Sequence, residues 1–139
     1  MNSKAKTRIA ACGCGQLSAE VRGEPLDVYL CSCTDCQRLS GSSYSYQAIF
    51  PPDAVTVKGE RKTWRHHGES GRWLENVFCP DCGNTVVCLG EIGPEIGICV
   101  GTFAESDFPP PQRVYWASRR HRWLELPEEA ELFDKQPGL

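Results

Sequence analysis

Hydrophobic and polar residues alternate over much of the chain, and a period of two residues is the pattern of a half-buried β-strand. Tyr44, Tyr46, Ala48 and Phe50 show this alternation clearly, and Pro51 ends the run. The segments that predict strands, by alternation or by a short apolar run, are residues 17–22, 28–31, 44–50, 55–57, 63–64, 73–78, 85–89, 96–103 and 114–116. Most of the chain is therefore expected to form short strands.

Helical sequence is scarce. The best candidate is residues 34–40, with Thr34 as the expected N-cap and Gly41 as the residue that ends the helix. The 13 glycines and 10 prolines supply the turns that many short strands require. A chain of 139 residues fits one domain, residues 1–139, which we expect to be mainly β with little helix.

Composition narrows the class of protein. An apolar share of 40% and a charged share of 24% are those of a soluble globular protein. A formal net charge of -3 argues against binding nucleic acid through bulk electrostatics. Residues 1–11 lack the apolar core of a signal peptide, and no later stretch is long enough to span a membrane. We therefore expect a cytoplasmic protein with neither a membrane nor a nucleic-acid partner.

Nine cysteines are the unusual feature of this composition. In a reducing compartment, closely spaced cysteines indicate metal binding or catalysis rather than disulfides. The odd count also leaves at least one thiol unpaired in any disulfide scheme. Seven cysteines fall into three short segments and are the expected metal ligands: Cys12, Cys14, Cys31, Cys33, Cys36, Cys79 and Cys82.

The sharpest local motif is Cys79-Pro80-Asp81-Cys82-Gly83. Two cysteines at this spacing can chelate one ion when the chain between them turns tightly. Pro80 presets a turn dihedral angle, and Gly83 permits the left-handed conformation that often follows the second ligand. Because apolar segments flank the motif on both sides, we expect a β-hairpin with the cysteines at its tip.

Two further segments offer ligands. Cys12-Gly13-Cys14-Gly15 is a closer pair, and in an extended chain both sulfurs would face the same side. Cys31-Ser32-Cys33-Thr34-Asp35-Cys36 packs three possible ligands into one short stretch. Structural zinc is closed by four protein ligands, whereas catalytic zinc keeps one position open. A catalytic site is therefore most expected at residues 31–36.

Spacing alone leaves two groupings open. In the first, the pairs at positions 33/36 and 79/82 form a conventional zinc ribbon, which leaves the other three cysteines over. In the second, the pairs at 12/14 and 79/82 form a closed site, and positions 31, 33 and 36 form an open one. Cys88 and Cys99 lie in apolar strands, where we expect them to act as small buried hydrophobic residues.

The sequence resembles the glutathione-dependent formaldehyde-activating enzyme family, which also includes centromere protein V. The resemblance covers about residues 8–133. It runs in order through Cys12-Gly-Cys14-Gly, Cys31-x-Cys33-x-x-Cys36 with Gln37-Arg38-Leu39-Ser40-Gly41, Phe78-Cys79-Pro80-Asp81-Cys82-Gly83, Val100-Gly101-Thr102, Trp116-x-Ser118-Arg119 and Trp123. Many members carry an Arg shortly before the Phe-Cys step, where this chain has Glu75-Asn76-Val77, and this departure predicts a different substrate preference.

The resemblance implies a β-tent-like fold of antiparallel sheets and two zinc ions per chain. It implies structural zinc on Cys12, Cys14, Cys79 and Cys82, and catalytic zinc on Cys31, Cys33 and Cys36. The implied enzyme is a carbon–sulfur lyase that adds a thiol such as glutathione to formaldehyde or a related small carbonyl, or cleaves that adduct. Zinc that is bound by three thiolates would favour sulfur as its fourth ligand, and a substrate thiol could supply that sulfur.

Other residues are weaker candidates. His66 and His67 could supply a fourth ligand or a base, although adjacent histidines on a turn are commonly solvated. Asp35 is expected to orient the start of the helix, and Tyr44 or Tyr46 to line a pocket while the other packs in the core. A short basic run could attract a carboxylate but more often forms a solvated edge: Arg119, Arg120 and Arg122.

Two other functions remain open. A non-catalytic zinc module that binds a protein or nucleic acid would need a closed second site, with His66, His67 or Cys99 as the fourth ligand. A thiol redox or metal-buffer protein would release zinc under mild oxidation.

Overall fold

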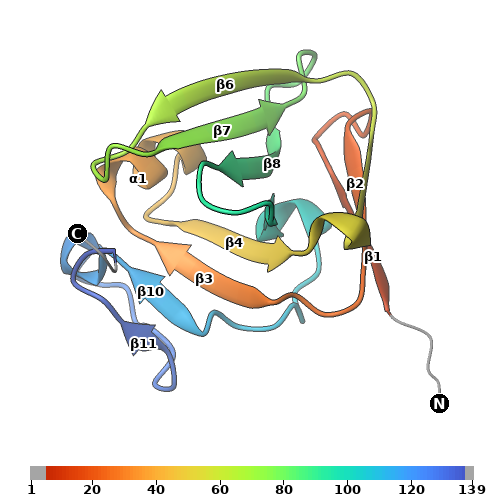
Figure 1. The fold of residues 1–139 in the computed structure, drawn as a ribbon. Helices are drawn as coiled ribbons and strands as arrows, with labels where there is room; N and C mark the ends of the chain where they lie inside the picture. Colours follow the sequence, from red (N-terminus) through yellow and green to blue (C-terminus); the bar gives the residue numbers. More distant parts are fainter. Residues whose placement is uncertain (1–5, 137–139) are drawn as a thin grey trace.

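Eleven strands and one α-helix make up residues 6–136, the part of the chain that the computed structural model describes (Figure 1). In chain order they are β1 (Thr7–Ala11), β2 (Ser18–Arg22), β3 (Asp27–Cys31), α1 (Thr34–Ser40), β4 (Ser45–Phe50), β5 (Val55–Lys58), β6 (Lys62–His67), β7 (Trp73–Phe78), β8 (Thr85–Gly90), β9 (Ile96–Cys99), β10 (Arg113–Tyr115) and β11 (Glu131–Leu132). Three 3₁₀-helices lie at Pro52–Ala54, Val100–Phe103 and Ala117–Arg119. Among these residues no helix has the length and apolarity needed to cross a membrane. The expectation of a mainly β fold with little helix is confirmed.

The strands form two sheets. The smaller sheet is antiparallel with the order β1-β2-β5, and the larger has the order β11-β10-β3-β4-β9-β8-β7-β6. In the larger sheet β10 runs parallel to both β3 and β11, whereas the other strand pairs are antiparallel, so the sheets are mainly antiparallel as expected. The reason for the parallel pairing is topological. Residues 100–112 separate β9 from β10, and a connection of this length can return a strand in the parallel sense, which a two-residue hairpin cannot.

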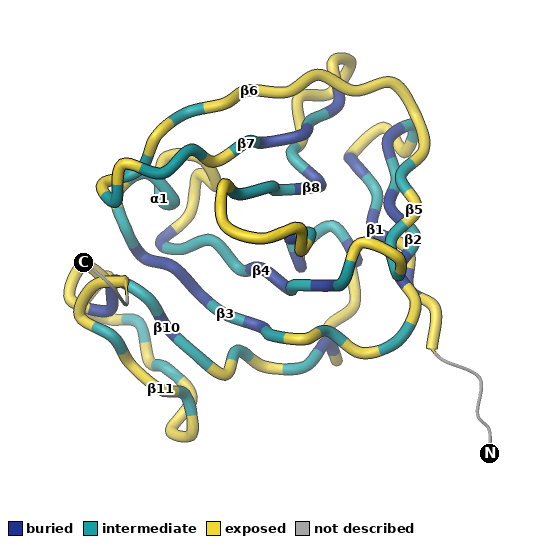
Figure 2. Tube along the Cα trace, in the orientation of Figure 1, coloured by how far each residue is buried: buried dark blue, intermediate teal, exposed yellow. Residues whose placement is uncertain are grey.

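The core lies where the small sheet packs on the large one. Ala19 and Val21 of β2 are fully buried, whereas Glu20 and Arg22 between and beyond them are more exposed. Side chains of the large sheet, such as Phe50 and Ile98, belong to the same buried cluster. Figure 1 shows the small sheet at one end of the large sheet and α1 at the other, and Figure 2 shows buried segments in both sheets. No residue of α1 is buried, so the end that carries α1 lies outside this core.

In β1 a charged residue faces inward and an apolar residue faces outward, so the alternation of apolar and polar residues does not reveal this strand in the sequence. Arg8 and Ala10 face inward, whereas Ile9 is 59% exposed. The guanidinium of Arg8 lies 3.4 Å from carboxylate oxygens of both Glu24 and Glu105, and its carbon lies 4.8 Å from the centre of the Phe108 ring. These partners compensate the burial of a charged group.

The strand expected over residues 96–103 is too long. β9 ends at Cys99, and a 3₁₀-helix follows in which Val100 and Phe103 are buried. A continuous apolar run carries no period, so it does not distinguish a buried strand from a buried helical turn.

Candidate functional site

The turn between β7 and β8 carries the first pair of cysteines. The backbone amide of Gly83 donates to the carbonyl of Cys79 over 2.8 Å, and Gly83 has a φ of 80°. The Sγ of Cys79 also accepts a hydrogen bond from the amide of Asp81 at 3.4 Å. The expected hairpin with cysteines at its tip and the left-handed glycine are both confirmed.

The second pair lies in a turn rather than in an extended segment. The amide of Gly15, with a φ of 84°, donates to the carbonyl of Cys12 over 3.0 Å. The turn places the sulfurs of Cys12 and Cys14 3.6 Å apart. The expected extended conformation is therefore wrong, because Gly15 lets the chain reverse immediately after the second cysteine.

These two turns meet to form what we call the four-cysteine cluster: Cys12, Cys14, Cys79 and Cys82. All four sulfurs lie within 4.8 Å of one another, and those of Cys14 and Cys79 are 3.7 Å apart. The side-chain oxygen of Asn84 links the turns, because it accepts hydrogen bonds from the amide of Gly13 at 2.6 Å and from Cys82 at 3.6 Å.

Gln16 supports this cluster, a role that no motif in the sequence indicates. Its Nε2 donates to the Sγ of Cys79 at 3.0 Å and to the carbonyl of Glu60 at 2.7 Å, while its Oε1 accepts from the amide of Glu60. Burial raises the pKa of Cys79, but hydrogen bonds from Gln16 and from the amides of Cys82 and Asp81 outweigh it and lower this pKa to about 6. These hydrogen bonds therefore favour the thiolate form of Cys79, which is the form that binds a metal ion.

We expect Gln16→Ala to weaken metal retention by the four-cysteine cluster about 10- to 100-fold, because outer-shell hydrogen bonds orient ligands and stabilise thiolates. Competition between the zinc-loaded protein and a chromophoric chelator measures the change. Gln112→Ala is the matched control, since Gln112 borders a different cleft. Equal zinc release from both variants would contradict this role.

The remaining three clustered cysteines lie where β3 meets α1, and we call Cys31, Cys33 and Cys36 the three-cysteine cluster. Their sulfurs also lie within 4.8 Å of one another. The helix has the predicted bounds, but its N-cap is Cys33 rather than Thr34. The Sγ of Cys33 accepts a hydrogen bond from the amide of Cys36 at 3.2 Å, so a sulfur takes the place that a hydroxyl was expected to fill.

Hydrogen bonds among the three thiols shift their pKa values in opposite directions. Hydrogen bonds from Cys31 and Cys36 lower the pKa of Cys33 to about 3, while the hydrogen bond to Cys33 raises the pKa of Cys31 far above its usual value. Only one thiolate is therefore favoured in the absence of a cation, and a metal ion that takes all three sulfurs must displace the remaining protons. Soft thiolate donors in this number fit zinc, as do those of the four-cysteine cluster.

A cavity of about 450 Å³ opens onto the three-cysteine cluster. Its apolar and aromatic walls come from strands that are distant in sequence and include Tyr29, Trp73, Leu74, Leu89, Tyr115 and Trp116. The expectation that Tyr44 or Tyr46 lines a pocket is not met, since both pack against a smaller core cluster. Tyr46 also donates its hydroxyl to the carbonyl of Pro109 at 2.6 Å.

The histidines are separated by the structure. His66 lines the cavity, and its Nε2 lies 3.2 Å from Oδ1 of the buried Asn76, whereas His67 is exposed. Among residues 6–136, neither histidine and no further cysteine or carboxylate joins the three-cysteine cluster within 4.8 Å. The fourth protein ligand that a closed site would require is thus not found in the described part of the chain.

The two other cysteines and Arg119 of the basic run have local partners. The sulfurs of Cys88 and Cys99 lie 4.0 Å apart, both residues are half-buried rather than fully buried, and Cys88 borders the cavity. Arg119 pairs with Glu69 at 2.5 Å and stacks over the ring of Trp116.

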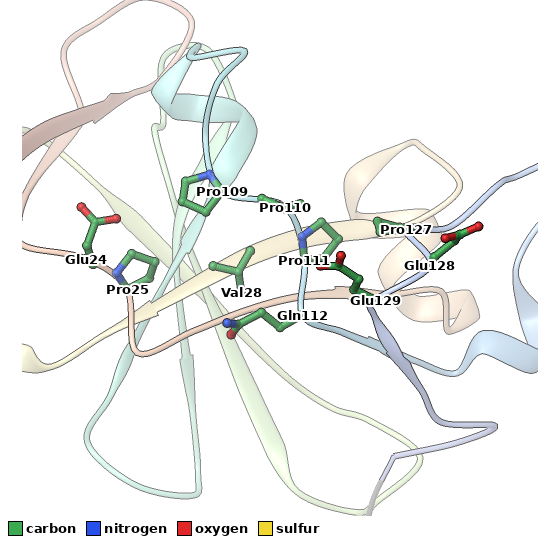
Figure 3. Close-up of a pocket in the computed structure, with 10 residues that line it drawn as sticks. All are labelled: Glu24, Pro25, Val28, Pro109, Pro110, Pro111, Gln112, Pro127, Glu128 and Glu129. Carbon is green, nitrogen blue, oxygen red and sulfur yellow. The ribbon is translucent and has the colours of Figure 1, made fainter.

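A larger cleft of about 840 Å³ lies elsewhere and is lined by prolines and carboxylates (Figure 3). Its lining residues are Glu24, Pro25, Val28, Pro109, Pro110, Pro111, Gln112, Pro127, Glu128 and Glu129. This lining offers neither a thiol nor an imidazole, so the smaller cavity is the one equipped for sulfur chemistry.

Comparison with known proteins agrees with this arrangement. A family model described as glutathione-dependent formaldehyde-activating enzyme matches residues 7–119, which include all seven clustered cysteines. A crystal structure of a Rhodobacter sphaeroides protein, a structural genomics target, superposes with a TM-score of 0.53 at 22% identity, covering 73% of this chain and 91% of that one. At this identity the likeness concerns the fold alone. No curated protein matches the sequence.

Proposed function

The chain belongs to the glutathione-dependent formaldehyde-activating enzyme family, and from this premise we propose that it adds a small thiol to a small carbonyl compound. Formaldehyde is the carbonyl and glutathione the thiol that the family name suggests. The reverse reaction cleaves a carbon–sulfur bond, so the proposed enzyme is a carbon–sulfur lyase. The observation that carries the proposal is a cavity that ends on three sulfurs with no fourth protein ligand among residues 6–136.

The proposal assigns different roles to the two clusters. The three-cysteine cluster would hold a catalytic zinc ion, and the four-cysteine cluster a structural one, giving two zinc ions per chain. When bound, zinc would supply a soft, electron-poor position that favours sulfur and lowers the pKa of a thiol. Tyr29, Tyr115 and Trp73 wall the cavity and limit the access of water to the reacting atoms.

His66 is the proposed proton carrier, because the nitrogens of an imidazole can both accept and donate a proton and this ring borders the cavity. It would accept the thiol proton as the sulfur attacks the carbonyl carbon. A carbon–sulfur bond then forms, the carbonyl π bond breaks, and the proton returns to the oxygen to give a hydroxymethyl thioether. The contact with Asn76 holds the ring in place.

An NMR assay with glutathione and formaldehyde tests the proposal. We expect the native zinc-loaded protein to accelerate adduct formation on the order of a hundredfold over the uncatalysed addition. Cys33→Ser should return the rate to that background. Because the uncatalysed addition is itself easy, a protein-free reaction is an essential control. Equal rates for native protein and Cys33→Ser would reject catalysis.

A further inference from the structure

The cavity beside the three-cysteine cluster has an acidic lining. Four carboxylates and one guanidinium border it, a net charge of -3, and they are Asp35, Glu69, Glu91, Glu95 and Arg72. Of the carboxylates, Glu69 is already paired with Arg119 at 2.5 Å. Three negative charges therefore face the cavity against the single positive charge of Arg72.

These carboxylates reach the cavity from two parts of the chain. Asp35 lies between the second and third cysteines of the cluster, in the first turn of α1. Glu91 and Glu95 lie in the exposed turn that joins β8 to β9, which is yellow in Figure 2. The Oε1 of Glu91 accepts a hydrogen bond from the amide of Trp73 at 3.0 Å, and this contact fixes the side chain at the cavity wall without neutralising its charge.

A zinc ion held by Cys31, Cys33 and Cys36 would add to this negative charge, since three thiolates exceed the charge of one zinc ion. A thiol that enters as a thiolate brings a further negative charge. Glutathione carries two carboxylates and one ammonium group, so its net charge opposes the lining. A thiol with a positively charged group and no carboxylate would instead be attracted to it.

We propose that this cavity binds a cationic aminothiol more tightly than an anionic thiol such as glutathione. This inference rests on the proposed function, because it names the thiol that the same cavity accepts. Glu91 and Glu95 are the specificity-determining residues, and Asn76, which contacts His66, contributes no compensating positive charge. One charge pair at a partly exposed site changes affinity on the order of tenfold.

Calorimetric titration of the zinc-loaded protein with three matched probes tests the inference: cysteamine, which is cationic, 2-mercaptoethanol, which is neutral, and 3-mercaptopropionate, which is anionic. Because the probes differ in intrinsic acidity, the decisive quantity is the change in each affinity on substitution. In the double variant Glu91→Gln and Glu95→Gln, we expect cysteamine to bind about tenfold more weakly and 3-mercaptopropionate more tightly. The affinity for 2-mercaptoethanol should stay unchanged.

The matched control is the double variant Glu128→Gln and Glu129→Gln, which removes two carboxylates from the other cleft (Figure 3) and should alter no affinity. The native preference for cysteamine should also shrink at high salt, because the acidic side chains are exposed. An equal change for all three probes, or the same change in the control variant, would overturn the inference. Glutathione binding that weakens when Glu91 and Glu95 are neutralised would overturn it as well.

The calorimetric test of the charge preference can be separated from the NMR test of the proposed reaction. The NMR assay, repeated with each probe and formaldehyde, reports turnover, whereas calorimetry reports the charge preference. Charge-dependent binding without accelerated adduct formation would refute the reaction and leave the inference standing. Accelerated adduct formation without a charge preference would support the reaction and refute the inference.

Discussion

Cys79→Ser is expected to yield a protein that is largely unfolded. Cys79 is fully buried, and its sulfur accepts hydrogen bonds from Gln16 and from the turn that follows it. If the four-cysteine cluster holds structural zinc, the binding free energy contributes directly to folding and reaches about 10 kcal/mol in zinc-finger peptides. That is comparable to the whole stability of an ordinary domain, about 5–15 kcal/mol.

Circular dichroism and thermal denaturation of the purified variant measure this effect. Cys88→Ser is the matched control, because Cys88 lies in β8 of the same hairpin but belongs to neither cluster. The control should fold and keep its zinc. A Cys79→Ser protein with native secondary structure and a native melting temperature would refute the structural role.

Cys36→Ser is expected to have the opposite phenotype, a folded chain with one zinc ion in place of two. The three-cysteine cluster lies at the end of the large sheet, outside the main buried cluster, so its loss removes little of the core. We expect the melting temperature to fall by no more than about 5 °C. Catalysed adduct formation should be lost completely.

Elemental analysis combined with native mass spectrometry counts the zinc ions of each variant. Cys99→Ser serves as the control and should retain both. If Cys36→Ser and Cys79→Ser unfold to the same extent, the two clusters do not divide structural and catalytic roles.

The fold was predictable from the sequence wherever local patterns decide the structure. Residues 34–40 form the expected helix because Gly41, with a φ of 66°, ends it and the preceding residues offer a cap. The hairpin that carries Cys79 was equally clear from its turn residues and apolar flanks. In both cases a few adjacent residues determine the geometry.

Prediction failed where distant segments decide. β1 was missed because its inward-facing Arg8 finds its partners Glu24 and Glu105 only in the folded protein. The parallel pairing of β10 depends on the route of a long connection. The cavity walls are a third example, since Tyr29 and Tyr115 come from paired strands whose residues are far apart in the chain.

The two cysteine clusters also differ in how far apart along the chain their members lie. The three-cysteine cluster is made by one short segment, whereas Cys14 and Cys79 of the other cluster are separated by 65 positions. Closing a loop of that length costs chain entropy that a local contact does not. During synthesis the first cluster can assemble as soon as α1 emerges, but the second must wait for the hairpin of β7 and β8. In the growing chain the three-cysteine cluster is therefore complete before the four-cysteine cluster.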